Sequence, residues 1–175
     1  AVPITYGIVR DDFDDLFEKC TMALARSDMV LISGGSSVGT RDFTIEVLSA
    51  LPESEILVHG ISISPGKPTI LAKAGGQAIW GLPGQVTSTM VVFEIVVRPF
   101  IEHIGGLSLE HKRHFNLVAR LNRNISSTQG RADYIRVKLI EKDGVLWAEP
   151  ILGKSGLINT MAVSYTHLTL PTNRE

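Results

Sequence analysis

Two glycine-rich stretches have the composition of loops that bind oxyanions. The first, SGGSSVGTRDF at residues 33–43, follows a short apolar run and carries Asp42 near its end. The second, GLPG at residues 81–84, precedes a long apolar segment. Glycines allow successive backbone amides to point inward, and such amides favour phosphate-like anions. Plain turns between a strand and a helix also use glycine, so the residues alone leave both interpretations open.

A third stretch, SPGKP at residues 64–68, places a lysine between two prolines. The prolines restrict the backbone around Lys67, so its ammonium group starts from a rigid turn and suits an oxyanion. The alternative is a solvated turn lysine. Asp42 also has an ordinary interpretation, as the cap of a helix that begins near Thr44. The first loop lacks the lysine of a P-loop and the spacing of a dinucleotide fingerprint, so neither standard nucleotide motif applies.

Apolar periodicity predicts the elements that hold these loops. Residues 13–24 place apolar side chains on one helical stripe behind the candidate caps Asp11 and Asp12. Cys20 lies on this stripe, which indicates core packing. Residues 29–32 form a continuous apolar run, typical of a strand covered on both faces in a parallel sheet.

The next expected elements run to the end of the second apolar segment. They are a helix at residues 44–51, a strand pattern at 55–64 with a bulge at Gly60, two strands within residues 70–84 turning at Gly75 and Gly76, and a long helix capped by Thr87 or Ser88 and ended by Gly105 and Gly106. Strand and helix alternate in this part, which predicts an α/β fold.

Beyond the long helix the pattern becomes all-β. Residues 114–121 alternate apolar and polar side chains, and residues 133–150 predict two strands joined near Asp143 and Gly144. We therefore expect a domain boundary near Leu107.

Composition and charge exclude several classes of partner. Seventeen basic and eighteen acidic residues give a net charge of −1, which offers no footprint for nucleic acid or an anionic membrane. The most apolar segment, residues 86–104, contains Glu94, Arg98 and Pro99, so we interpret it as a buried helix rather than a membrane span. A single cysteine cannot form an internal disulfide. A reducing, cytoplasmic location is therefore expected.

Four stretches, SGGSSVGTRDF, SPGKP, GLPGQVTS and GRADYIRV, occur in the order and spacing found in molybdopterin molybdenumtransferases, the family that includes the gephyrin E domain. The chain resembles that family over residues 1–162. The resemblance implies a three-layer α/β/α molybdopterin-binding domain at residues 1–107 without its first strand and helix. It also implies a small, truncated β-barrel domain at residues 108–162. Residues 163–175 resemble a translated library adaptor and are predicted to be a non-native tail.

The resemblance implies an enzyme of molybdenum cofactor biosynthesis that inserts molybdate into adenylated molybdopterin and releases AMP, with Mg²⁺ as cofactor. The implied catalytic residues are Asp42, which would also hold the metal, and Lys67. The residues implied to bind the pterin, its phosphate or molybdate are Gly34, Gly35, Ser36, Ser37, Gly39, Pro65, Gly66, Pro68, Gly81, Pro83, Gly84, Ser88 and Arg131. Ser155 is a further candidate. Gln85 and Val86 replace an asparagine and a proline that are usual in the family, which predicts a less rigid second loop.

Two other functions stay open. A molybdopterin adenylyltransferase shares the α/β domain and the glycine loop with its aspartate, although stand-alone adenylyltransferases lack a barrel. A non-catalytic molybdopterin-binding or scaffold module is the other alternative, since the gephyrin E domain also dimerises and binds receptor peptides. Family members carry further upstream domains, and another subunit completes their cleft. We therefore expect a homodimer for the full-length protein and little or no activity for this fragment alone.

Overall fold

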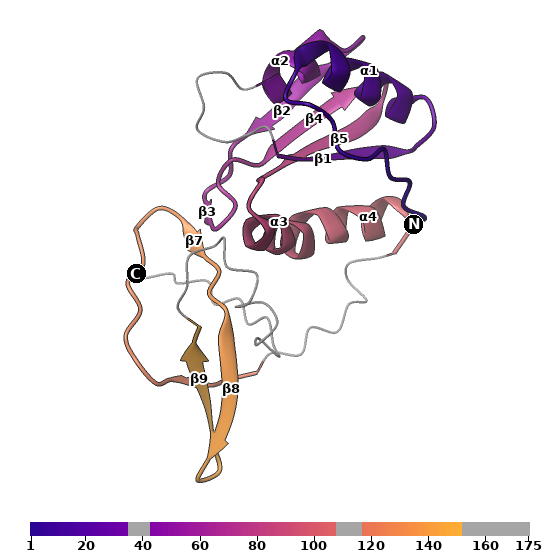
Figure 1. Cartoon of the computed structure of the whole chain (residues 1–175). Helices are drawn as coiled ribbons and strands as arrows, with labels where there is room; N and C mark the ends of the chain where they lie inside the picture. The colour runs from indigo at the N-terminus through magenta and orange to yellow at the C-terminus, as the bar shows by residue number, and fades with distance from the viewer. Residues whose placement is uncertain (35–42, 108–116, 152–175) are drawn as a thin grey trace.

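A mixed four-stranded sheet forms the centre of the first part of the chain (Figure 1). The computed structural model describes residues 1–34, 43–107 and 117–151. In sheet order, the strands are β1 (Met29–Ser33), β5 (Gln77–Leu82), β4 (Ile70–Ala74) and β2 (Glu55–His59). The β1–β5 pair is parallel, whereas the β5–β4 and β4–β2 pairs are antiparallel. The expected parallel arrangement is thus limited to one pair of strands.

Helices cover both faces of this sheet (Figure 1). On one face, α1 (Phe13–Leu24) and α2 (Phe43–Ala50) enclose a core that includes the fully buried Val47 and Leu48. The helical segment at residues 86–104 packs on the other face. The α/β class and the α/β/α layering are confirmed.

The first helix begins and packs as predicted. Of the two candidate caps, Asp12 is the N-cap, and its carboxylate accepts hydrogen bonds from the backbone N–H groups of Asp14 and Asp15 at 3.0 and 3.1 Å. Cys20 lies in the core and is 2% exposed. Burial raises the pKa of the Cys20 thiol to about 11. A thiol in this state is a packing group rather than a reactive nucleophile.

Two expectations about the strands are wrong. Leu31 in β1 is 41% exposed, so this strand is not covered on both faces; among the described strands it is an edge of the sheet. The register of β2 on β4 shifts between Ile56 and Val58, so the bulge lies there and not at Gly60. Gly60 follows β2 with a φ of 86°, and its N–H donates to the Thr69 carbonyl at 2.8 Å. This glycine therefore serves a turn. The other glycine turn, between β4 and β5, is where the sequence predicts it.

The long helix starts earlier than predicted. α3 (Val86–Val92) has Gln85 as its N-cap, with extended backbone angles and no side-chain hydrogen bond to the helix end. Thr87 and Ser88 already have helical backbone and are buried within the first turn, so neither of them is the cap. The hydroxyl-bearing residues that suggested a cap thus lie inside the helix.

A π-helical turn (Phe93–Val97) joins α3 to α4 (Arg98–Ile104). Pro99 lacks the N–H group that would continue the α-helical ladder, and the wider turn just before it accommodates the missing bond. The helix ends at Gly105 and Gly106, as predicted, and Gly106 has a φ of 84°. Among the helices of the described residues, none combines the length and hydropathy needed to cross a membrane.

The second part of the described chain is all-β, as predicted. β6 (Arg120–Leu121), β9 (Val145–Pro150) and β8 (Val137–Lys142) form a three-stranded sheet in that order. The turn between β8 and β9 is the predicted one, because Asp143 and Gly144 have φ values of 53° and 71°. The closure of this sheet into a barrel stays a prediction.

A pair of short strands links the two parts. β3 (Ile63–Ser64) pairs in parallel with β7 (Ala132–Asp133), so Ile63 lies opposite Ala132 and Ser64 opposite Asp133. The strand pattern at residues 55–64 is therefore divided between two sheets. In Figure 1 this pair lies between the α/β layers and the β8–β9 hairpin.

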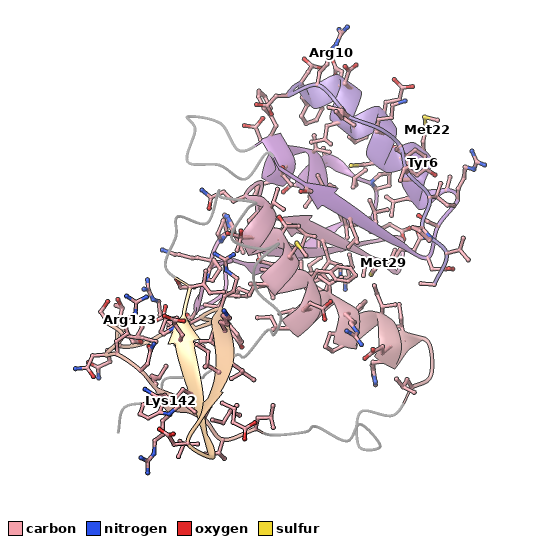
Figure 2. All side chains as sticks on the ribbon, turned by 60° about the horizontal axis from the view of Figure 1, so that its bottom comes forward. Tyr6, Arg10, Met22, Met29, Arg123 and Lys142 are labelled. Carbon is pink, nitrogen blue, oxygen red and sulfur yellow. The ribbon has the colours of Figure 1, made fainter. Side chains whose placement is uncertain are left out.

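Figure 2 labels Tyr6 on the α/β part and Lys142 on the β8–β9 hairpin. Arg123 lies beside the hairpin and donates from Nη2 to the Pro150 carbonyl at 2.8 Å. The domain boundary near Leu107 stays a prediction. Residues 108–116 and 152–175 lie outside the described residues, so the strand and tail predicted there are not addressed by the structure.

Candidate functional site

Three of the four sequence motifs meet at one open cleft of about 850 Å³. Its lining consists of residues 59–68, residues 83–85, Ser88 and residues 130–131. These segments come from the SPGKP turn, the second glycine loop and the start of GRADYIRV. The cleft therefore combines residues from both the α/β part and the all-β part.

Hydrogen bonds fix the turn that carries Lys67. The Lys67 carbonyl accepts from the Ile61 N–H at 2.9 Å, and the Gly60 N–H donates to the Thr69 carbonyl at 2.8 Å. The buried Thr69 hydroxyl donates to the Gly66 carbonyl at 2.7 Å. The Lys67 side chain itself is exposed at the cleft. The backbone of Lys67 is thus fixed by hydrogen bonds as well as by the two flanking prolines. Thr69 helps to fix this turn, a role that the sequence analysis did not predict.

Gly66 sets the distance between this turn and α3. Its φ is 119°, a backbone conformation that L side chains rarely adopt. A Cβ atom there would lie 2.5 Å from Val92 Cγ2 and 2.9 Å from Ile63 Cδ1. The absence of a side chain therefore lets the lysine turn pack directly on the helix.

The second glycine loop is closed by Thr89. Its hydroxyl donates to the Pro83 carbonyl, and its backbone N–H donates to the Gln85 carbonyl at 3.0 Å. These contacts hold the loop so that Ser88, which is 5% exposed, contributes to the cleft wall. Thr89 follows GLPGQVTS directly in the sequence, and a hydroxyl residue in the first turn of a helix was the available signal for this role.

The two glycine loops adjoin each other. A Cβ atom on Gly84 would lie 3.4 Å from Gly34 Cα, and the Gly34 N–H donates to the Leu82 carbonyl at 3.2 Å. β1 and β5 are parallel, so both loops leave the carboxyl edge of the sheet, where open α/β sheets bind ligands. The described start of the first loop therefore lies beside the second loop, which lines the cleft.

Arg131 reaches the cleft from the all-β part. Its side chain is 42% exposed, and its Nε lies 2.9 Å from Oδ1 of the buried Asp133. The other oxygen of Asp133, Oδ2, accepts from Ser127 Oγ at 2.6 Å and from the Thr128 N–H at 3.4 Å. The carboxylate of Asp133 thus connects a cationic cleft residue to a fixed backbone segment.

The protonation of Asp133 reflects opposing influences. Burial of the carboxyl raises its pKa, but hydrogen bonds from Ser127, Thr128 and Ser64 and the charge of Arg131 act in the other direction. On balance the pKa lies below its ordinary value. Asp133 therefore remains a carboxylate at neutral pH.

The charge of the described cleft lining is positive. Lys67 and Arg131 both line it, and no aspartate or glutamate does among the described lining residues. An anion in the cleft would therefore meet two cations, the Ser88 hydroxyl and loop backbone. His59 also lines the cleft, a role for which its sequence position provides no signal.

Several predicted site residues do not lie in this lining. Gly81 lies inside β5, where a Cβ atom would be 3.1 Å from Ile70 and 3.3 Å from Thr44, so its smallness serves core packing. Others fall outside the described residues: Gly35, Ser36, Ser37, Gly39, Asp42 and Ser155. Within the described ranges, no cluster of three or more His, Cys, Asp or Glu side chains could hold a metal ion.

Comparison with known families and proteins yields consistent matches. Residues 1–103 match a family described as "Probable molybdopterin binding domain", and residues 118–175 match the "MoeA C-terminal region (domain IV)". The second match includes residues 163–175, whose non-native origin stays a prediction.

Among curated proteins, the chain is 34% identical over 148 residues to the molybdopterin molybdenumtransferase of a Nostoc species, covering 83% of this chain and 34% of the relative. It is 27% identical over 172 residues to the enzyme of the same name from Bacillus subtilis, covering 98% of this chain and 39% of the relative. The chain thus spans less than half the length of these relatives.

Solved structures include a similar protein. The molybdopterin biosynthesis moeA protein from Pyrococcus horikoshii superposes with a TM-score of 0.71 and 35% identity, covering 90% of this chain and 36% of that chain. This likeness extends through both described parts of the chain.

Proposed function

Since this chain belongs to the family of molybdopterin-binding domains, we propose that it is part of a molybdopterin molybdenumtransferase, which inserts molybdate into adenylated molybdopterin and releases AMP. One observation carries the proposal: Lys67, Ser88 and Arg131, from three distant segments, line the same cleft. A tetrahedral dianion needs this set of fixed donors. The match of residues 118–175 to the MoeA C-terminal region disfavours a stand-alone adenylyltransferase.

In this proposal the cationic side chains capture molybdate. The Lys67 ammonium group acts as a compact point charge, and the Arg131 guanidinium offers parallel N–H donors to two oxygens of one anion. The Ser88 hydroxyl donates a further hydrogen bond. A charge-assisted hydrogen bond contributes about 1.5–3 kcal/mol. Together these donors hold the oxyanion beside the pterin and offset its charge.

The glycine loops bind the phosphate part of the substrate in the same proposal. Amides of Gly35, Ser36 and Ser37 would face the phosphate, with Gly84 and the second loop beside them. The Gly34 amide was expected to join them, but its N–H donates to the Leu82 carbonyl at 3.2 Å. Mg²⁺ would be held by Asp42 and by substrate phosphate oxygens, a ligand set that Mg²⁺ commonly uses. When bound, the ion supplies positive charge that makes the carboxylate compatible with the anion.

The whole protein is proposed to work as a cytoplasmic homodimer. The expected little or no activity of this chain alone agrees with its coverage of about two fifths of the Bacillus subtilis relative, 39%. The single cysteine, buried in the core, suits a reducing location. Light scattering of the full-length protein tests whether it is a dimer, and cell fractionation tests whether it is cytoplasmic.

Calorimetric titration of molybdate into the 175-residue chain tests the anion site. We expect Lys67→Ala and Arg131→Ala each to weaken molybdate binding about tenfold or more, from the loss of a charge-assisted bond. Lys138→Ala is the matched control, because Lys138 is an exposed cation on β8 that does not line the cleft. Equal affinities in the wild type and in both cleft variants would refute the proposed site.

A second titration tests the metal proposal. AMP is titrated into the wild type and into an Asp42→Asn variant, with and without Mg²⁺. We expect the magnesium-dependent part of AMP binding to disappear in the variant, because a neutral amide is a weaker ligand for the ion. Identical magnesium dependence in both proteins would remove Asp42 from the site.

A further inference from the structure

The Asp133 carboxylate is held at both of its oxygens although it does not line the cleft. Oδ1 lies 2.9 Å from Arg131 Nε, and Oδ2 accepts from Ser127 Oγ at 2.6 Å and from the Thr128 N–H at 3.4 Å. The Asp133 side chain is 8% exposed, whereas the Arg131 side chain is 42% exposed. The pair thus has one buried, fixed member and one member that faces the cleft.

The backbone of Asp133 is fixed to the strand that leads into the lysine turn. Ser64 lies opposite Asp133 in the β3–β7 pair. On either side of it, the Ala132 N–H donates to the Ser62 carbonyl at 2.9 Å, and the Tyr134 N–H donates to the Ser64 carbonyl at 2.7 Å. Asp133 is therefore a link through which the position of the guanidinium depends on the strand that precedes SPGKP.

A guanidinium group is planar, so a carboxylate held against Nε limits the directions in which its terminal nitrogens can donate. Asp133 Oδ1 forms an ion pair with Arg131 and lies 2.9 Å from its Nε. Without that ion pair, the long side chain regains rotamers that must be lost again on binding. Preorganisation of this kind increases affinity without adding any contact to the ligand.

We propose that Asp133 is a positioning residue that holds the Arg131 guanidinium so that its Nη groups face an oxyanion in the cleft. Asp133 itself does not touch the oxyanion. This inference rests on the proposed function, since it assigns a role within the same anion site.

Removal of the Asp133 charge separates this inference from simple electrostatics. Loss of a negative charge near an anion site strengthens anion binding if charge alone matters. Loss of a positioning contact weakens it. Asp133→Asn preserves the size of the side chain, so the sign of the change in affinity distinguishes the two accounts.

The experiment measures the dissociation constant of molybdate by calorimetry in the 175-residue chain. We expect Asp133→Asn to weaken binding about tenfold, which corresponds to about 1.4 kcal/mol. In an Arg131→Ala background the same substitution is expected to have no effect, because the group that it positions is absent. Ser127→Ala, which removes one donor to the carboxylate, is expected to weaken binding in the same direction but less. Ser127→Ala replaces Asp133→Asn as the test variant if Asp133→Asn does not fold.

A spectroscopic readout tests the link without any anion. The order parameter of the Arg131 Nε–H vector should be high in the wild type and fall in Asp133→Asn, because the ion pair that restrains the guanidinium is lost. Glu94→Gln is the matched control, because it removes a carboxylate 2.8 Å from Arg98 Nη1 on the helix, and neither residue lines the cleft. The control should change neither molybdate binding nor the order parameter of the Arg131 Nε–H vector.

The outcomes separate the inference from the proposed function. Unchanged or tighter binding in Asp133→Asn, with weaker binding in Lys67→Ala and Arg131→Ala, would overturn the positioning role alone. An equal loss in both Arg131 backgrounds, or a low order parameter of the Arg131 Nε–H vector in the wild type, would also overturn it. If Lys67→Ala and Arg131→Ala bind molybdate as the wild type does, the proposed anion site fails, and the inference fails with it.

Discussion

Gly66→Ala is the substitution whose effect follows most directly from the packing of the lysine turn. A non-glycine residue at a φ of 119° is strained, which costs about 1–3 kcal/mol. The new Cβ would lie 2.5 Å from Val92 Cγ2 and 2.9 Å from Ile63 Cδ1, and overpacking adds about 1–3 kcal/mol. We therefore expect the free energy of unfolding to fall by about 2–6 kcal/mol.

Two comparisons separate the steric part from the conformational part. Gly75 also has a positive φ, 54°, but a Cβ atom there would meet nothing within 4 Å. Gly75→Ala should therefore cost only about 1–2 kcal/mol for its backbone conformation. Val92→Ala removes the nearest clashing methyl groups, so the penalty of Gly66→Ala should be smaller in that background than in the wild type.

Urea unfolding followed by circular dichroism measures these differences. The two glycine variants, Val92→Ala and the Gly66→Ala/Val92→Ala double variant complete the set. Equal losses for Gly66→Ala and Gly75→Ala, together with strict additivity of the Gly66 and Val92 changes, would refute the steric argument. Because a clash would displace the lysine turn from α3, molybdate binding should also weaken in Gly66→Ala and remain unchanged in Gly75→Ala.

Three further predictions concern the second loop, the core thiol and the buried carboxylate. Val86→Pro should raise the free energy of unfolding in urea by about 0.4–1 kcal/mol. Val86 is the first helical residue, and Gln85 already has the extended backbone angles that precede proline. An equal or lower urea midpoint of unfolding would contradict this. Burial raises the pKa of Cys20 to about 11, so iodoacetamide at pH 8 should modify the folded chain far more slowly than the unfolded chain, and stability should fall as pH rises above 9.0, the value of the unperturbed thiol. Burial raises the pKa of Asp133, but its hydrogen bonds and Arg131 lower it overall. The stability that this carboxylate provides is therefore present above pH 3.8 and lost as pH falls through its folded pKa. The free energy of unfolding should fall less steeply with decreasing pH in Asp133→Asn, and an unchanged pH dependence would be the contrary result.

Local features of the chain were predictable where neighbours in sequence decide the structure. The apolar stripe and Asp12 define α1 because helical spacing and capping act within a few residues. The turns at Gly75 and Gly76 and at Asp143 and Gly144 require positive φ angles that these residue types tolerate. The four motifs likewise indicated the family, because each is a short, continuous stretch.

Features set by tertiary contacts were predicted less well. The apolar run around Leu31 predicts a buried strand, but Leu31 is exposed, because its burial depends on what covers the edge of the sheet. Gln85 replaces the expected helix cap because the closing contacts of Thr89 place the loop. Gly81, which resembles a loop glycine in GLPG and was expected to bind the ligand, does not line the cleft, because its pairing places it opposite Ile70 in the sheet.

The amino-acid sequence by itself determined which side chains can bind an anion, since that depends on residue type and on local rigidity around Lys67. No local pattern determined that Arg131 meets them, although the resemblance to a family implied it. That meeting depends on the parallel pairing of β3 with β7, which joins residues about seventy positions apart and has no local pattern. Only the folded backbone, with Asp133 buried between the two parts, brings the cations to one cleft.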